Sequence, residues 1–146
     1  MDAGSLKLFS RLISMGSSSL LQYVSESFPW SADPAHAAFE AVLVIARQER
    51  DEVVRFTRLL QKRHLNLPPM GAYPSHFTTI NFVSLDYLLP KLIAEHEREI
   101  AEIDSMLPQT GDDDLRELAL AYRNRKHRHL QTLQALAASK TPAGAA

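Results

Sequence analysis

Proline-rich breaks divide this chain into four long segments, and within each segment apolar residues recur at the spacing of a helix. The breaks lie around Pro29 and Pro34, at residues 64–78 ("HLNLPPMGAYPSHFT") and at residues 108–114 ("PQTGDDD"). The segment 64–78 contains three prolines and a glycine, so it cannot be helical throughout. No segment shows the sustained alternation of apolar and polar residues that is typical of a half-buried strand. The sequence therefore predicts an all-α bundle of four helices.

The same breaks set the expected helix boundaries. The first helix should end near Phe28, and the second should begin at Pro34, since proline favours the first helical position, and run to about Arg63. The third should follow the long break and end near Leu107, with a kink at Pro90. The fourth should follow the aspartates of the last break, whose charge suits the positive end of a helix.

The lengths of the connections indicate the order of the helices. Short connections after the first and third helices favour two antiparallel hairpins. The connection at 64–78 has 15 residues, and at about 3.3 Å per residue it can span the full length of a bundle. This pattern favours two antiparallel helix hairpins joined by a long crossover connection; a simple up-down bundle with a decorated loop is the alternative.

Composition limits the class of protein. A chain of 146 residues suits a single domain, expected over 1–138, with 139–146 as a disordered tail. The net charge of -1, from 16 basic and 17 acidic residues, gives no overall attraction to nucleic acid or to an acidic membrane, so neither partner is expected. The absence of cysteine excludes disulfides and thiolate metal sites. The first 16 residues lack a long apolar stretch, so we expect neither a secretory signal nor a membrane span there, and predict a cytoplasmic location.

Several charged or imidazole side chains fall on the apolar stripes of the predicted helices when residues are placed at about 100° per residue. They are Glu49 and Glu52 in the second helix, His96 in the third with Glu95 and Glu99 toward one edge, and Lys126 and His129 in the fourth. Antiparallel hairpins bring Glu49, Glu52, His96, Lys126 and His129 to similar heights, which predicts a buried polar layer at mid-bundle. Because burying such groups unpaired is costly, they should pair with one another or with a metal. The remaining basic residues of 123–128 are expected to form a solvated helix face.

At this layer the sequence resembles the ferritin-like superfamily, especially the bacterioferritin and rubrerythrin type of di-iron bundle. In that family two helices each carry Glu-x-x-His and the other two carry one Glu each, all pointing inward. Here "ERDE", residues 49–52, matches the first motif with Glu52 in place of the histidine. The segment "KHRH", residues 126–129, matches the second, keeping His129 but placing Lys126 where the bridging glutamate is expected. The resemblance implies a ferritin-like four-helix bundle with a degenerate di-metal motif.

Two further positions depart from the family pattern. His96, or alternatively Glu95 or Glu99, stands for the carboxylate of the third helix, and Gly16 replaces that of the first. A pair of iron ions needs bridging carboxylates to balance its charge, whereas Lys126 brings positive charge to the place of a metal cation. These departures from the family pattern therefore argue against ferroxidase or oxygen-activating chemistry.

Three interpretations of the polar layer stay open. In the first, Lys126 pairs with Glu49 or Glu52 in place of metal. In the second, Glu49, Glu52, His96 and His129 hold one divalent ion, Fe, Mn or Zn, since two imidazoles and two carboxylates suit these metals. In the third, the layer binds a small anionic or polar ligand in a cavity left by Gly16.

These observations favour a protein that is non-catalytic or binds a single divalent metal. They also favour self-association, for example as a dimer. The enzymatic alternative is a metal-dependent oxidase or peroxide-handling enzyme of the di-iron carboxylate type, which would use Glu49, Glu52, His96 and His129. The sequence contains no phosphate-binding glycine loop, nucleophile elbow or zinc-protease motif.

Overall fold

The computed structural model describes residues 1–27, 36–66, 73–74, 77 and 84–140. These residues form helices and no strand, which confirms the all-α prediction for this part of the chain. The elements in chain order are α1 (Ala3–Ser17), α2 (Leu20–Ser27), α3 (His36–Lys62), α4 (Leu85–Met106), the 3-10 helix η3 (Leu107–Gln109) and α5 (Asp113–Lys140). The end of α5 at Lys140 lies two residues past the expected end of the domain, and the rest of the predicted tail lies outside the described residues.

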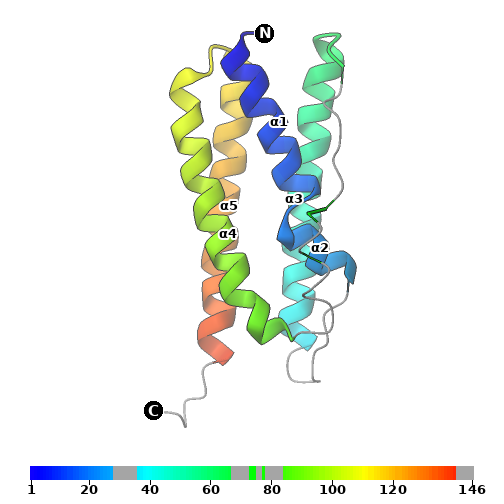
Figure 1. Cartoon of the computed structure of the whole chain (residues 1–146), viewed down its shortest axis with the longest axis vertical. Helices are drawn as coiled ribbons and strands as arrows, with labels where there is room; N and C mark the ends of the chain where they lie inside the picture. The colour runs from blue at the N-terminus through cyan, green and yellow to red at the C-terminus, as the bar shows by residue number, and fades with distance from the viewer. Residues whose placement is uncertain (28–35, 67–72, 75–76, 78–83, 141–146) are drawn as a thin grey trace.

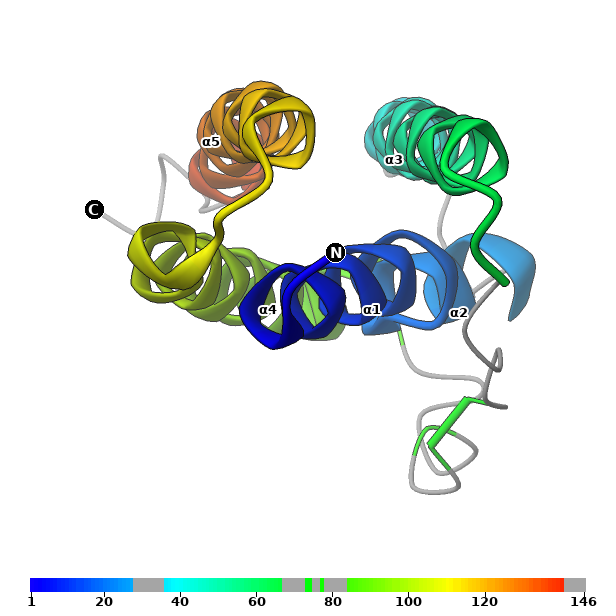
Figure 2. The ribbon, with the colours of Figure 1, turned by 90° about the horizontal axis from the view of Figure 1, so that it is seen from above.

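In the described part of the chain, α3, α4 and α5 each form one helical column, and α1 and α2 in series form another (Figure 1). Seen from above, α3 and α5 form one row, and α4 and α1 form the other (Figure 2). In Figure 1, α1 and α5 run downward from the upper end of the molecule, whereas α3 and α4 run upward. This arrangement is consistent with a four-helix bundle.

The first column contains a break that the sequence did not predict. Instead of one helix that ends near Phe28, α1 ends at Ser17 and α2 begins at Leu20. Serine hydroxyls at this point bond to the backbone, which competes with regular helix hydrogen bonds. The Ser18 hydroxyl donates to the Ser14 carbonyl (3.1 Å), and the Ser19 hydroxyl accepts from the Gln22 N–H (3.3 Å). The prediction of a single first helix was therefore wrong.

Side-chain caps fix the starts of α1 and α5. The Asp2 carboxylate accepts from the Ser5 N–H (2.8 Å), and the Asp112 carboxylate accepts from the Leu115 N–H (3.0 Å). Such caps satisfy backbone donors that have no partner within the helix. Asp112 also pairs with Arg63, which ties the end of α3 to the start of α5. Helix α4 continues through Pro90, where the sequence predicts a kink.

Among the described residues, the apolar core consists of two clusters. One joins α2 to the first half of α3, the first half of α4 and Leu133 of α5. The other joins α1 to the second half of α3, the end of α4 and the start of α5. On α3, α4 and α5 the buried polar residues occupy the stretch between these clusters, so the polar layer is held from both sides by packed apolar side chains. Within the described residues, no helix combines the length and the apolar character needed to cross a membrane.

Candidate functional site

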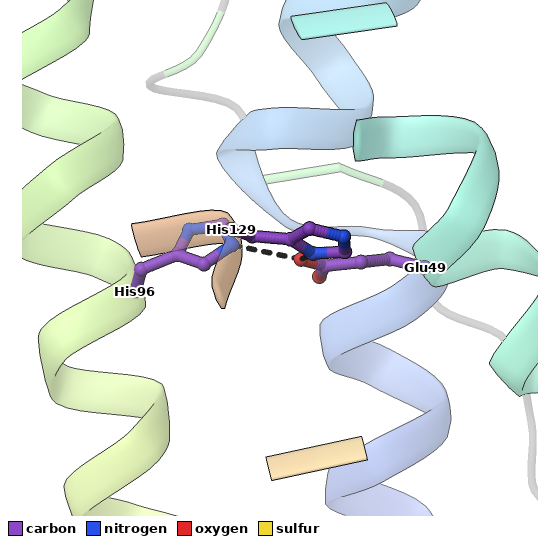
Figure 3. Close-up of side chains that lie close together, drawn as sticks. All are labelled: Glu49, His96 and His129. Carbon is purple, nitrogen blue, oxygen red and sulfur yellow. Dashed lines mark hydrogen bonds and ion pairs between the residues drawn. The ribbon is translucent and has the colours of Figure 1, made fainter. Parts of the chain in front are cut away.

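Three side chains from three helices meet in the polar layer (Figure 3). They are Glu49 of α3, His96 of α4 and His129 of α5, and all three are buried. The Glu49 Oε2 atom lies 2.7 Å from His96 Nε2 and 2.8 Å from His129 Nδ1. One ligand atom of each residue lies within 4.8 Å of those of the other two, so the group is compact enough to surround a single ion.

The second oxygen of Glu49 faces a buried cation. Glu49 Oε1 accepts from Lys126 Nζ (2.6 Å) and from the Tyr122 hydroxyl (3.2 Å). Lys126 also donates to Glu99 Oε1 (3.0 Å), and its Nζ lies 4.8 Å from the centre of the Tyr122 ring. The predicted inward positions of Lys126 and His129 are confirmed, and the lysine pairs with Glu49 and Glu99 rather than with Glu52.

The outer ring nitrogens of both histidines are held by oxygen atoms. His96 Nδ1 lies 3.2 Å from the Leu92 carbonyl oxygen, which can only accept a hydrogen bond, so this nitrogen donates. His129 Nε2 lies 2.8 Å from Gln48 Oε1 and donates in the same way. In both rings the other nitrogen points at Glu49 Oε2. Metal-binding histidines are oriented by this kind of second hydrogen bond, which fixes the ring and its protonation.

The charges of the central pair are fixed by their neighbours. Burial alone would raise the pKa of Glu49, but the Lys126 charge and the hydrogen bonds from both histidines hold that pKa well below its ordinary value. Burial would lower the pKa of Lys126, but Glu49 and Glu99 hold it well above its ordinary value. Burial and the Glu49 charge raise the pKa of Tyr122, so its hydroxyl stays neutral and donates. The layer therefore contains a buried carboxylate and a buried ammonium at neutral pH.

Glu99 belongs to this layer more closely than the sequence indicated. The helical pattern placed it toward the edge of the stripe, yet the residue is buried and bonded to Lys126. Burial, together with the charges of Glu95 and Glu49, raises the pKa of Glu99 to about 7 against the attraction of Lys126. The signal in the sequence was its position three residues after His96, on the same face of the helix.

Glu52 is buried as predicted but does not reach the three-residue group. Its Oε1 atom lies 3.2 Å from a guanidinium nitrogen of Arg125 and 3.3 Å from one of Arg55, while its Oε2 has no hydrogen-bond partner. The structure thus brings together Glu49, His96 and His129, and Glu52 is not part of that group.

Gly16 marks a close approach of two helices and not a cavity. A Cβ atom at Gly16 would lie 2.4 Å from Val53 Cγ2 and 3.0 Å from the Glu49 carbonyl oxygen. The Tyr122 hydroxyl lies 3.5 Å from the same point. The expected ligand cavity at Gly16 was wrong, because α1 packs directly against α3 at this level and the tyrosine completes the contact.

A second set of ligand-type residues, Glu95, His96 and Glu99, also lies within 4.8 Å. Both carboxylates in it already have strong partners. Glu95 accepts from the N–H groups of Leu20 (2.9 Å) and Leu21 (3.2 Å) and so caps α2, and Glu99 accepts from Lys126. The first set, in which both histidines are oriented toward one oxygen, is the better candidate for a metal.

No family model, curated protein or solved structure matches this chain. What the site does is therefore inferred from its own side chains.

Proposed function

We propose that this protein is a ferritin-like bundle that binds one divalent metal ion through Glu49, His96 and His129 and is not an enzyme. The observation that carries the proposal is the convergence of three ligand atoms from three helices, with both imidazoles held at their outer nitrogens. Two imidazoles and one carboxylate suit Zn, Fe or Mn.

Lys126 is the reason for proposing one ion and not two. A di-iron centre uses carboxylates that bridge two cations. Here one oxygen of Glu49 faces the histidines and the other faces Lys126 Nζ at 2.6 Å. The ammonium thus stands where a second cation would bind, and the proposed bundle lacks the paired irons of oxygen-activating members of the superfamily.

The directions of the helices support the ferritin-like part of the proposal. Helices α3 and α4 run the same way in Figure 1, and each lies beside an antiparallel partner, α1 and α5 respectively. We propose that the connection between α3 and α4, most of which lies outside the described residues, is a crossover between two hairpins. A cytoplasmic location and self-association as a dimer stay predictions from the sequence.

Metal binding at this site should release protons. The inner nitrogens of His96 and His129, which would hold the metal, lie 2.7 and 2.8 Å from Glu49 Oε2. Because a histidine nitrogen binds a metal ion only when it carries no proton, the metal affinity should increase as the pH rises.

The test is elemental analysis of protein purified without chelator or a metal-carrying tag, followed by thermal melts with Zn, Mn or Fe(II) added back. We expect one ion per chain and a higher melting temperature, equivalent to about 2.7 kcal/mol at a metal concentration of one hundred times the Kd. His129→Ala should abolish the effect. The matched control is His127→Ala, two residues away on the exposed face of α5, which should retain it.

The opposite result would assign the layer to structure alone. If the protein contains no metal, gains no stability on add-back and responds alike in both histidine variants, the pairing of Lys126 with Glu49 and Glu99 accounts for the layer without an ion.

A further inference from the structure

A solvent-open groove of about 570 Å³ lies between α3 and α5, directly beside His129. Successive turns of both helices line the groove. The lining residues include Gln48, Asp51 and Arg55 from α3, and Arg125, Arg128 and His129 from α5. Two of the arginines come from the basic run that the sequence assigned to a solvated face. In the structure these two arginines line one solvent-open groove together with Arg55.

The charges of this groove are not balanced by its own carboxylates. Arg55 and Arg125 share one oxygen of Glu52, at 3.3 and 3.2 Å. No described residue pairs with the Arg128 side chain. The three arginines of the lining are matched by two carboxylates, Asp51 in the lining and Glu52 outside it, which leaves an excess of positive charge. Each guanidinium has five N–H donors, and a single shared oxygen satisfies few of them.

The groove and the buried site share one residue, His129. His129 lines the groove and donates from Nε2 to Gln48 Oε1, which lines it too. A molecule in the groove would therefore lie against the residues that orient the His129 ring.

We propose that this groove binds a small oxyanion, a phosphate or carboxylate group, through Arg128, Arg125 and Arg55. Guanidinium groups recognise both groups through paired, charge-assisted hydrogen bonds. The site is formed by protein side chains alone, so this proposal goes beyond the metal proposal and does not depend on it.

The test is calorimetric titration of the metal-free full chain with inorganic phosphate and, separately, with malonate, at constant ionic strength in chloride. We expect saturable binding of one anion. Tighter binding of phosphate would identify a phosphate group as the ligand chemistry, and tighter binding of malonate a carboxylate. Arg128→Gln should weaken the tighter of the two by about tenfold, since charge-assisted hydrogen bonds are about twice as strong as neutral ones.

The control is Arg98→Gln, which removes one exposed arginine from α4, outside the groove, and should leave the affinity within about twofold of the unmodified chain. In the same titration followed by NMR, the ring signals of His129 should move and those of exposed His127 should not. Absence of saturable binding would overturn the proposal. Equal weakening by both arginine variants would also overturn it, because it would indicate general charge attraction without a site.

Discussion

Glu49 and Glu52 lie one turn apart on α3 and are both buried, yet their surroundings differ. Each oxygen of Glu49 receives two hydrogen bonds, from Lys126, Tyr122, His96 and His129. One oxygen of Glu52 is shared by two arginines, and the other has no partner.

The difference lies in where the positive charges are. The Lys126 side chain is 0% exposed, whereas the arginines near Glu52 are 49% (Arg55) and 26% (Arg125) exposed. A fully buried pair is costly to break because the remaining charge stays out of water, while an exposed partner can be hydrated and is screened by salt. The layer around Glu49 should therefore be rigid and essential to stability, and the groove side near Glu52 should tolerate substitution.

The largest expected effect is that of Lys126→Met. It leaves the carboxylates of Glu49 and Glu99 without their cation and should lower the free energy of unfolding by on the order of 3 kcal/mol. Denaturant melts measure the change. The matched control is Arg125→Met, which removes a partly exposed cation from Glu52 and should cost less than about 1 kcal/mol. Equal losses of unfolding free energy in the two variants would contradict the proposed difference between the surroundings of Glu49 and those of Glu52.

The next largest effect on stability is expected when the two glutamates themselves are substituted. Glu49→Gln weakens the bonds from Lys126 and both histidines and should destabilise by about 2 kcal/mol. Glu52→Gln should change stability by less than about 0.5 kcal/mol, since its arginines can turn to solvent. A larger loss of stability in Glu52→Gln than in Glu49→Gln, measured by denaturant melts, would contradict this expectation.

A smaller effect is the pH dependence of folding stability that Glu99 produces. Its pKa is about 7 in the folded protein and near its ordinary 4.5 when unfolded. Between these values the folded state binds more protons, so the stability that protonated Glu99 contributes is fully present below pH 4.5 and is lost as the pH rises through 7. The loss can reach about 1.4 kcal/mol for each pH unit.

Glu99→Gln should remove this dependence. Stability of the two proteins, measured by denaturant melts at several pH values, should diverge across the window from 4.5 to 7 and run parallel above it. Parallel curves across the whole window would mean that Glu99 is not protonated near neutrality. The lowered pKa of Glu49 acts at more acidic pH, so it does not interfere.

Much of the polar layer could be predicted from the sequence because helical spacing alone decides which residues point inward. Glu49, His96, Lys126 and His129 lie on apolar stripes and are buried in the structure. The spacing cannot resolve neighbours one turn apart, so it grouped Glu52 with Glu49 although their carboxylates face different partners. It also left Glu99 at an edge, because burial of that residue depends on Lys126 from another helix.

Two other features could not be predicted from the residues of one helix alone. At the break near Ser18, the local serine hydrogen bonds are joined by a cap from Glu95, a residue of α4, on the start of α2. Gly16 shows no turn or proline signal, and only the approach of α3 explains why a side chain is excluded there. In both cases a residue from a distant part of the chain makes one of the contacts, which helical spacing does not reveal.

The most direct test of the proposed metal site is a crystal structure of the zinc-loaded protein with data collected on both sides of the zinc absorption edge. We predict one anomalous peak per chain, about 2.0–2.2 Å from His96 Nε2, His129 Nδ1 and a Glu49 oxygen, with Lys126 still bonded to the other oxygen of Glu49. Zinc found only at surface residues, with the inner nitrogens of both histidines still bonded to Glu49, would contradict the proposal.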